Sequence, residues 1–269
     1  NYPIDFNKSP KKLEIIIKKL KPDYIIDFVS IAMVNQSWQF PKVYFDVNIN
    51  YKLHIFQNLN TFNFIKKYIL ISTPEIFGDN KKTLKEESYI FNPSTPYAIS
   101  KLGTELLLKC YAKRYNIPFV ITRFTNFYGP GQPIYRLIPK ILACIEKKIK
   151  FPLEGGGNSS RNFIYTFDFC NGIYKAMLKG KNFDTYHFSS NKYYKIKEIV
   201  KIICSMKKID HRILIKKTKS RVGQDDIYKL NSNKTRKILK WKTIYSLQKG
   251  IQEIINYNKT RFKKFYKKN

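Results

Sequence analysis

Short apolar runs and longer amphipathic stretches alternate along the first half of the chain. Three runs are mostly apolar, as in strands buried on both faces of a parallel sheet, and they lie at residues 24–30, 68–71 and 119–124. The segments around them place apolar residues three and four apart, as on one face of a helix, at residues 9–21, 41–64 and 97–115. This alternation predicts a parallel, doubly wound sheet, with 24–30 as a central strand.

The second half is interrupted by glycine and proline. A dense cluster of these residues at 129–133 predicts that the chain leaves the main sheet for a smaller lobe. Gly155-Gly156-Gly157 lacks the Lys-Ser/Thr that follows in a phosphate-binding loop, so it predicts a turn between strands. We expect helices at 134–148 and 196–206, extended segments at 151–154 and 212–215, a loop at 33–38 and a polar, lid-like insertion at 81–93.

Composition limits the class of protein. The chain has 269 residues, of which 43% are hydrophobic, enough for one domain or one domain with a small lobe. No apolar run approaches the roughly 18 residues of a membrane-spanning helix, and the first residues lack the pattern of a signal peptide. We therefore expect a cytoplasmic protein without a membrane partner.

A formal net charge of +32 is also typical of nucleic-acid-binding proteins. The lysines, however, are spread in ones and twos from Lys8 to Lys268, among many Asn, Ile, Tyr and Phe residues whose codons are rich in A and T. This favours a biased genome and a solvated basic surface over a nucleic-acid partner. Residues 259–268 are the best candidate for an RNA-contacting tail, and the end of a last helix is the other interpretation.

Neither the cysteines nor the histidines have the spacing of a metal site. Four cysteines, Cys110, Cys144, Cys170 and Cys204, stand far apart in apolar, helix-like contexts, which predicts buried, reduced thiols. The three histidines show no ligand spacing either. We therefore expect no metal.

Candidate catalytic groups gather at the start of the helix predicted at 97–115. Tyr97 and Lys101 are four residues apart, on one helical face, where an ammonium can lower the pKa of a phenol. Thr73 follows a buried strand, at the place where α/β enzymes keep their sites. An exposed helical pair is the alternative, because the Tyr-x-x-x-Lys spacing occurs by chance in a chain rich in both residues. The strand end at Thr73 and the prolines before the helix, Pro93 and Pro96, favour the catalytic interpretation.

Four motifs occur in the order found in the extended short-chain dehydrogenase/reductases. They lie at residues 72–78 (STPEIFG), 96–101 (PYAISK), 122–132 (TRFTNFYGPGQ) and 155–164 (GGGNSSRNFI). In these motifs, which span nearly the whole chain, the sequence resembles the NAD-dependent epimerase/dehydratase family. Within that family it is most similar to dTDP-glucose 4,6-dehydratase-like proteins.

The resemblance implies a Rossmann-like, doubly wound parallel sheet with a smaller C-terminal substrate-binding lobe. Residues 1–130 would form the NAD-binding domain and residues 131–269 mainly the substrate-binding lobe, with 164–190 returning to the main domain. It also implies NAD as cofactor, a nucleoside-diphosphate sugar as substrate, and a homodimer formed through the helix of the Tyr-Lys pair. A buried apolar face on that helix would look the same in a monomer.

The family pattern assigns roles to particular residues. The residues that would contact NAD are Val29, Ser30, Asn48, Ser72, Tyr97, Lys101 and Phe124. For Asn48 the alternative is a buried side chain that ties a helix to a strand. The residues that would contact substrate are Asn126, Arg161, Asn191 and Arg221, with both arginines on the diphosphate. Asp5 is a candidate for the adenine end of NAD, or an exposed turn residue.

The reaction implied by the resemblance begins at C4 of the sugar. Tyr97 removes the hydroxyl proton while hydride passes to NAD, Lys101 holds the ribose, and Thr73 hydrogen-bonds the developing carbonyl. Glu75 is then placed to remove the C5 proton. Where the dehydratases carry an acid for the C6 hydroxyl, this chain has Pro74, which cannot donate a proton. Three alternatives remain: a divergent dehydratase lyase, an epimerase or decarboxylase, and a non-catalytic protein that binds nucleotide sugar or nucleic acid.

The glycine-rich turn that holds a dinucleotide pyrophosphate is not found in this sequence. Such a turn normally joins the first strand to the first helix, whereas the first glycine here is Gly78. We therefore expect either a fragment of a longer gene product or a naturally shortened relative.

Overall fold

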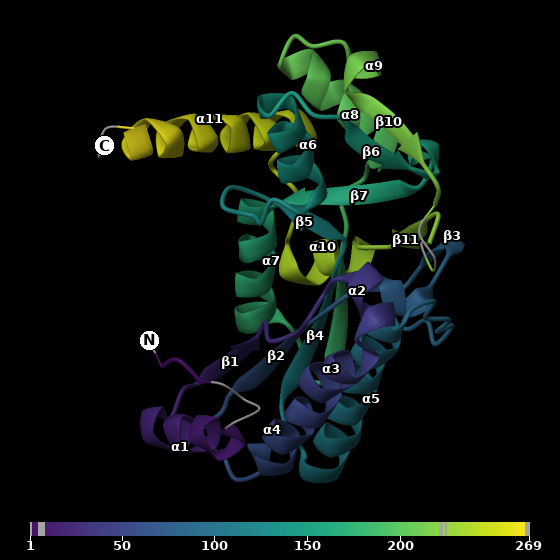
Figure 1. Ribbon diagram of the computed structural model, residues 1–269. Helices are drawn as coiled ribbons and strands as arrows, with labels where there is room; N and C mark the ends of the chain where they lie inside the picture. The colour runs from purple at the N-terminus through teal and green to yellow at the C-terminus, as the bar shows by residue number, and fades with distance from the viewer. Residues whose placement is uncertain (1, 5–8, 221–222, 224, 267–269) are drawn as a thin grey trace.

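The main layer of the fold is a four-stranded parallel sheet. In the computed structural model, which describes residues 2–4, 9–220, 223 and 225–266, the strands run in the order β1-β2-β4-β8 (Figure 1). All three pairings are parallel. The strands are β1 (Tyr24–Asp27), β2 (Lys67–Ser72), β4 (Phe119–Phe124) and β8 (Asp184–Phe188). This sheet confirms the predicted fold class.

Within the described part of the chain, β1 is an edge strand, so the prediction of a central strand at 24–30 is wrong. Ile26 and Phe28 remain 38% and 54% exposed. By contrast, residues 68–70 of β2 are at most 1% exposed, because β2 has a paired strand on each side. An apolar run indicates a strand but not its place in the sheet, since distant segments decide the pairing.

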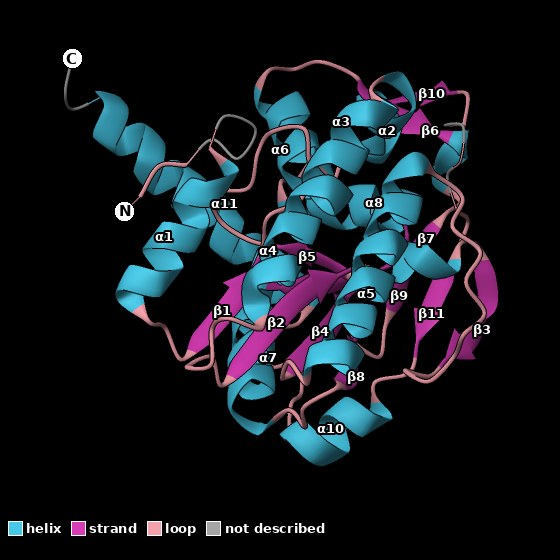
Figure 2. Cartoon of the chain, turned by 90° about the horizontal axis from the view of Figure 1, so that it is seen from below, coloured by secondary structure: helices cyan, strands magenta, loops and turns pink. Residues whose placement is uncertain are grey.

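Side chains of β2 and β4 alternate between two apolar layers. On one face, Tyr68, Leu70 and Ile121 pack against α1 (Pro10–Leu20), α4 (Tyr51–Leu59) and α5 (Pro96–Tyr115). On the other face, Ile69 and Val120 pack against α7 (Thr166–Lys179) and α10 (Asn233–Leu239). Figure 2 shows α4 and α5 side by side across the sheet. The helices predicted at 9–21 and 97–115 are therefore confirmed.

The long helix predicted at 41–64 ends earlier, at Leu59. It consists of α3 (Pro41–Phe45), a π-helical turn (Asp46–Asn50) and α4. A short helix, α2 (Val34–Gln39), replaces the loop predicted at 33–38. The Ser37 hydroxyl donates to the Val34 carbonyl at 2.6 Å, so this side chain is used within its own helix.

A smaller group of elements continues from the carboxyl ends of the main strands (Figure 1). Its sheet has the order β5-β7-β9, and β6 and β10 form a parallel pair beside it. The helices α6, α8 and α11 enclose a second apolar core against these strands. The bounds are β5 (Asn126–Tyr128), α6 (Leu137–Glu146), β6 (Phe151–Glu154), β7 (Ser160–Tyr165), β9 (Tyr193–Lys195), α8 (Ile196–Met206), β10 (Ile215–Thr218) and α11 (Leu247–Tyr266). A 3-10 turn at Gly155–Gly157 joins β6 to β7, as predicted.

Two segments differ from the sequence prediction because their partners are distant in the chain. β3 (Asn80–Leu84) pairs in parallel with β11 (Tyr228–Leu230), within the region expected to be a lid-like insertion. The segment predicted as a strand at 212–215 begins instead with a short helix, α9 (His211–Leu214), and the strand β10 follows it. Local periodicity does not reveal pairings of this kind.

The structure also bears on membrane spans, metal ligands and the exposure of the cysteines. Among the described residues, no helix has the length and apolar character needed to cross a bilayer, and no three potential metal-ligand side chains come together. Cys144 and Cys204 are buried, but Cys110 and Cys170 are exposed. The prediction of four buried thiols is therefore wrong for two of them, which lie on the outer faces of their helices.

Candidate active site

The carboxyl end of β2 presents two of the predicted catalytic residues. The strand ends at Ser72, and a 3-10 turn (Pro74–Phe77) follows immediately. Thr73 caps this turn, because its hydroxyl accepts a hydrogen bond from the Glu75 N–H at 3.3 Å, and Pro74 is its first residue. The turn holds Thr73 and Glu75 on the wall of one cavity.

The first turns of α5 bring two further residues to the same cavity. The helix begins at Thr95, whose hydroxyl caps it, and it buries Tyr97 and Lys101 on one face. The Thr73 side chain lies near Tyr97 and acts to lower its pKa. Lys101 Nζ donates to the Ile71 carbonyl of β2 at 2.8 Å. The structure thus brings together Thr73, Glu75, Tyr97 and Lys101.

The protein surroundings raise the pKa of Tyr97. Burial is the main cause, and the Glu75 carboxylate adds to it, while the Thr73 side chain and the Arg136 charge act in the opposite direction. The sequence predicts instead that Lys101 lowers this pKa. Burial outweighs the nearby cations, and the Lys101 ammonium is directed at a main-chain carbonyl.

Two other groups in the cavity have pKa values close to neutrality. Burial, together with the Lys52 charge and against the Asp27 and Glu105 carboxylates, lowers the pKa of Lys101 to about 8. Burial raises the pKa of Glu75 to about 7, with Arg161 opposing this shift and Asp225 adding to it. Groups that titrate near neutral pH inside a cavity are suited to proton transfer.

The cavity beside Tyr97 contains most of the predicted cofactor contacts. Its volume is about 290 Å³, and Ser30, Ser72 and Phe124 line it together with Tyr97 and Lys101. The Ser72 hydroxyl is buried without a hydrogen-bond partner among the described residues. A buried hydroxyl of this kind is costly unless a ligand supplies a partner.

Val29 and Asn48 are not among the residues that line this cavity. The Val29 N–H donates to Asp27 Oδ1 at 3.0 Å. The Asn48 side chain is fully buried and exchanges hydrogen bonds of 3.0 and 3.2 Å with the main chain of Ile31. It also donates to Ser100 Oγ at 2.9 Å. Asn48 therefore ties the π-helical turn to the loop after β1 and to α5, as the alternative interpretation expects.

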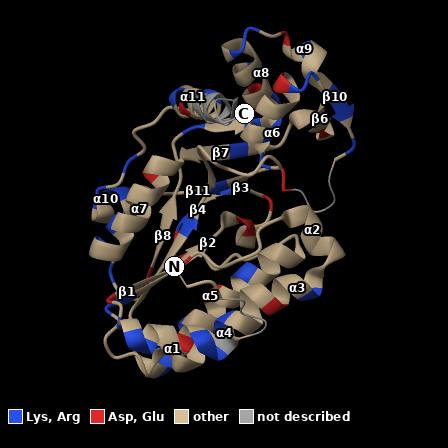
Figure 3. Ribbon diagram, turned by 60° about the vertical axis from the view of Figure 1, so that its left-hand side comes forward, with Lys and Arg blue, Asp and Glu red and all other residues tan. Residues whose placement is uncertain are grey.

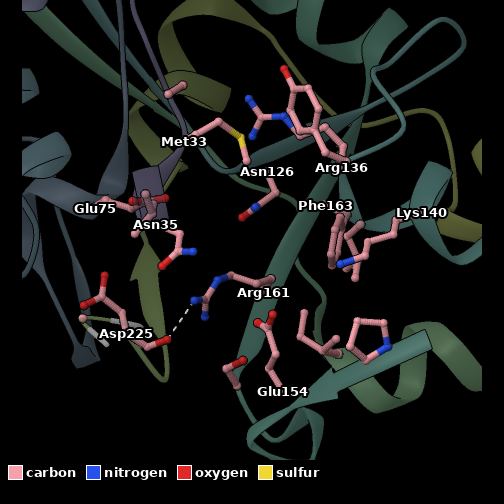
Figure 4. Close-up of a pocket in the computed structure, with 18 of the residues that line it drawn as sticks. Met33, Asn35, Glu75, Asn126, Arg136, Lys140, Glu154, Arg161, Phe163 and Asp225 are labelled. Carbon is pink, nitrogen blue, oxygen red and sulfur yellow. Dashed lines mark hydrogen bonds between the residues drawn. The ribbon is translucent and has the colours of Figure 1, made fainter. Parts of the chain in front are cut away.

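A second cavity, of about 230 Å³, adjoins the first. Glu75, Asn126 and Arg136 line both cavities. Figure 4 shows three cationic side chains, Arg136, Lys140 and Arg161, around the second one. Converging cations of this kind suit a ligand that carries phosphate groups.

Arg161, a predicted diphosphate contact, lines this cavity, and its guanidinium group makes several hydrogen bonds within the protein. It donates to the main-chain carbonyls of Asp225 at 2.8 Å and Asp226 at 3.2 Å. It also lies 4.9 Å from the centre of the Tyr228 ring. The Tyr228 hydroxyl donates to Asn126 Oδ1 at 2.8 Å, which holds that residue at the cavity.

One predicted substrate contact among the described residues, Asn191, is not brought to the site. Asn191 is exposed and lines neither cavity; its Oδ1 accepts a hydrogen bond from Arg236 at 2.6 Å. Arg221 and Asp5 lie outside the described residues. Their roles stay predictions.

Sequence comparison places the chain among known enzymes. The family described as GDP-mannose 4,6 dehydratase matches residues 7–254. The chain belongs to this family. A dTDP-D-glucose 4,6-dehydratase from Mus musculus is 27% identical over 263 residues, which cover 93% of this chain and 71% of that protein. Among the curated relatives compared, the matched share of their own length ranges from 29% to 74%.

Solved structures share the fold of this family member. DesIV, a dTDP-glucose 4,6-dehydratase from Streptomyces venezuelae, has a TM-score of 0.87 at 24% identity, and the match covers 93% of this chain and 78% of that one. A UDP-glucose 4-epimerase from Thermotoga maritima has a TM-score of 0.88 at 23% identity, with 95% and 83% covered. Likeness at this level of identity shows the fold alone.

Three charged residues that line the second cavity were not identified from the sequence. Arg136 is the N-cap residue of α6, and Lys140 lies one turn later. Two cations four residues apart, directly after the glycine-proline cluster, were a visible signal, but such pairs are common in so basic a chain. Asp225 was not identified because its place depends on the pairing of β3 with β11.

Proposed function

We propose that this chain is an NAD-dependent, 4,6-dehydratase-like lyase that acts on a nucleoside-diphosphate hexose through a 4-keto intermediate. The observation that carries the proposal is the convergence of Thr73, Tyr97, Lys101 and Glu75 on one cavity at the carboxyl end of β2. Family membership supports it, as do the relatives: the mouse protein is named a dTDP-D-glucose 4,6-dehydratase, and DesIV was solved with NAD bound.

The residues of the first cavity fit the nicotinamide riboside part of NAD. Ser72 offers a buried hydroxyl that lacks a partner among the described residues, Lys101 offers an ammonium for ribose hydroxyls, and Phe124 and Ser30 provide the wall. NAD, when bound, supplies the hydride acceptor for C4 of the sugar. The segment around β1 contains no glycine, since the first one in the chain is Gly78, so this fit concerns the nicotinamide end of NAD.

Val29 and Asn48 are proposed to serve the cofactor indirectly. Val29 lies in the segment after β1 and its N–H bonds to Asp27 at the end of that strand, while Asn48 bonds to Ile31 in the same segment. Ser30 lies on this segment and lines the first cavity. Loss of either bond would let the Ser30 wall move.

In the proposed reaction, different side chains carry out the two proton transfers. Tyr97 takes the proton of the C4 hydroxyl, and Thr73, which lines the same cavity, hydrogen-bonds the same oxygen. Glu75, with its pKa raised to about 7, takes the C5 proton that the neighbouring ketone has made acidic. Water access is limited because Tyr97 and Lys101 are buried.

The second cavity is proposed to bind the nucleotide part of the substrate. Arg136, Lys140 and Arg161 offer charges to the diphosphate, and Asn126 lies between the two cavities. Arg221 and Asn191 remain predicted contacts. We also propose the division into an NAD-binding domain (1–130) and a substrate-binding lobe (131–269), with 164–190 returning to the main domain, because α7 and β8 pack on the main sheet.

A homodimer in the cytoplasm is the proposed state of the enzyme. α5 exposes Ile99 and Leu106, each 45% exposed, and α3 exposes Val43 at 46% and Phe45 at 36%. Apolar side chains on neighbouring helices are typical of a surface that a second copy covers.

A nucleotide-sugar 4-epimerase is the second candidate. Such a reaction needs no acid for the C6 hydroxyl, and Pro74 provides none. The Thermotoga maritima epimerase has the same fold, which shows that the fold is compatible with this chemistry. The product therefore separates the two candidates, because a dehydratase gives a 4-keto-6-deoxy sugar and an epimerase an isomer.

The test is turnover of a panel of nucleoside-diphosphate hexoses with NAD, followed by mass spectrometry. We expect Tyr97→Phe to lower the rate by about 10²–10⁴-fold, since general acid–base catalysis contributes this much. Tyr115→Phe, on the same helix but 43% exposed, is the matched control and should behave as wild type. Full activity of Tyr97→Phe would overturn the assignment.

A further inference from the structure

Asp225 is a buried carboxyl on the wall of the second cavity. It is 7% exposed and comes just before β11. Among the described residues, its hydrogen-bond partner is the Ser94 hydroxyl, which donates to Oδ1 at 2.7 Å. Arg161 binds the main-chain carbonyl of Asp225, as the dashed line in Figure 4 shows, so this hydrogen bond leaves the carboxyl group unused. Asp225 plays no part in the reaction steps described so far.

Asp225 and Glu75 form a pair of like charges across the cavity. Both residues line the second cavity. The Arg161 charge lowers the pKa of each carboxyl, and each carboxylate raises the pKa of Tyr228. Glu154 also lines this cavity but belongs to β6, in the smaller lobe. Asp225 is therefore the cavity carboxyl whose charge acts on Glu75.

Elimination of water from a 4-keto hexose needs two protein groups. The C5–H bond breaks and its proton goes to a base, while the electron pair forms the C5–C6 double bond. The C6–O bond breaks with its electron pair, and the departing hydroxyl takes a proton from an acid and leaves as water. At the end of β2 only Glu75 can exchange a proton, because Pro74 has none to give.

We propose that Asp225 is the acid that protonates the C6 hydroxyl, while Glu75 is the base at C5. The inference rests on the proposed function. After the elimination Asp225 is a carboxylate and Glu75 a carboxylic acid. To complete the turnover, Glu75 gives its proton back to C5 while C6 regains the hydride from the nicotinamide reduced in the first step, and Asp225 regains a proton from solvent. The two roles require two carboxyls on one cavity, and the fold places them there from the turn after β2 and the segment before β11.

The charges around Asp225 favour the protonated form that an acid needs. Burial raises its pKa, and the carboxylates of Asp79 and Asp226 raise it further, against the Ser94 hydrogen bond and the Arg161 charge. Glu75 faces Arg161, Asp225 and Arg136.

The first experiment separates oxidation from elimination in a single turnover with NAD and substrate. We expect Asp225→Asn to form the 4-ketose and to lose water at least about 100-fold more slowly than wild type, and Asp225→Glu to recover part of the rate. Asp23→Asn is the control: its side chain is 58% exposed and it lies just before β1, at the end of that strand away from the cavities. Elimination by Asp225→Asn at the wild-type rate would overturn the inference.

The second experiment needs neither substrate nor cofactor. Carbon-13 NMR of labelled aspartate carboxyls, with the Asp225 signal identified from its loss in Asp225→Asn, follows the titration directly. We expect a midpoint above the ordinary aspartate range, because the carboxyl is buried. A midpoint within the ordinary range would contradict the inference. Failure of wild type to oxidise any hexose, with the Asp225 midpoint raised, would instead contradict the proposed function.

Discussion

Glu75 is the residue at which the two cavities meet. It lines both of them, and burial together with the Asp225 charge holds its pKa at about 7, although Arg161 and Arg136 oppose the shift. The ordinary value is 4.5. A carboxyl with this pKa is largely ionised only above neutral pH, which suits a base that must also hold a proton for part of the cycle.

The raised pKa of Glu75 makes stability depend on pH. Since the folded-state pKa lies above the unfolded value, the contribution of the protonated form is complete below about pH 4.5 and is lost as the pH rises through about 7. Glu75→Gln cannot ionise, so we expect it to be more stable than wild type at pH 8, by at most about 3 kcal/mol. The gain should vanish near pH 4. Thermal unfolding at both pH values measures this, and a loss of stability at pH 8 would contradict it.

The sequence located the residues whose positions depend on their neighbours in the chain. Tyr97 and Lys101 share a face because they are one helical turn apart, and Thr73 caps the turn directly after its strand. Asp225 and Arg136 could not be assigned, because what makes them functional is the approach of a distant segment. The same reason explains the pKa of Tyr97, which depends on burial that spacing does not reveal.

At the scale of secondary structure, a buried ionic cluster joins β1, β2 and α4. Asp27 of β1 accepts hydrogen bonds from Lys52 of α4 and from the Tyr68 hydroxyl of β2. The Lys52 and Asp27 side chains are 1% and 4% exposed. A charge buried this deeply is tolerated only while its partner is present. The cluster therefore fixes β1, and with it Ser30, relative to the rest of the sheet.

We expect Lys52→Met to destabilise the protein by about 3–5 kcal/mol, because it leaves the Asp27 carboxylate buried without its cation. Lys42→Met is the matched control: it breaks a 2.6 Å ion pair with Asp46, but the Lys42 side chain is 87% exposed, so stability should barely change. Urea unfolding of both variants measures the difference. Equal losses of unfolding free energy in the two variants would contradict a special contribution of the buried Lys52–Asp27 pair to stability.

At the scale of the whole molecule, basic residues occur on many elements of the described chain (Figure 3). The net charge is +32, and Figure 3 shows lysine and arginine scattered over both lobes. The cations that come together around a cavity are Arg136, Lys140 and Arg161, beside the second cavity. This arrangement favours a small anionic ligand over a long nucleic acid, whose backbone needs a continuous basic track.

The proposed homodimer gives a prediction at the same scale. We expect Leu106→Glu on α5 to shift the protein from dimer to monomer, because a charge on a covered apolar surface must lose its water. Leu178→Glu on α7 is the control, since Leu178 is 48% exposed on a different helix. Sedimentation equilibrium measures the masses. A monomeric wild type, or dissociation by both variants, would contradict an interface at α5.

The sequence by itself determined the alternation of strands and helices, the parallel sheet, and the positions of Thr73, Tyr97 and Lys101 on it. Each of these depends on periodicity or capping within a few residues, which the chain carries locally. Only the tertiary structure decided that β1 lies at an edge of the described sheet, that β3 pairs with β11, and that Asp225 shares a cavity with Glu75. These depend on contacts between segments far apart in sequence, and on the burial that such contacts create.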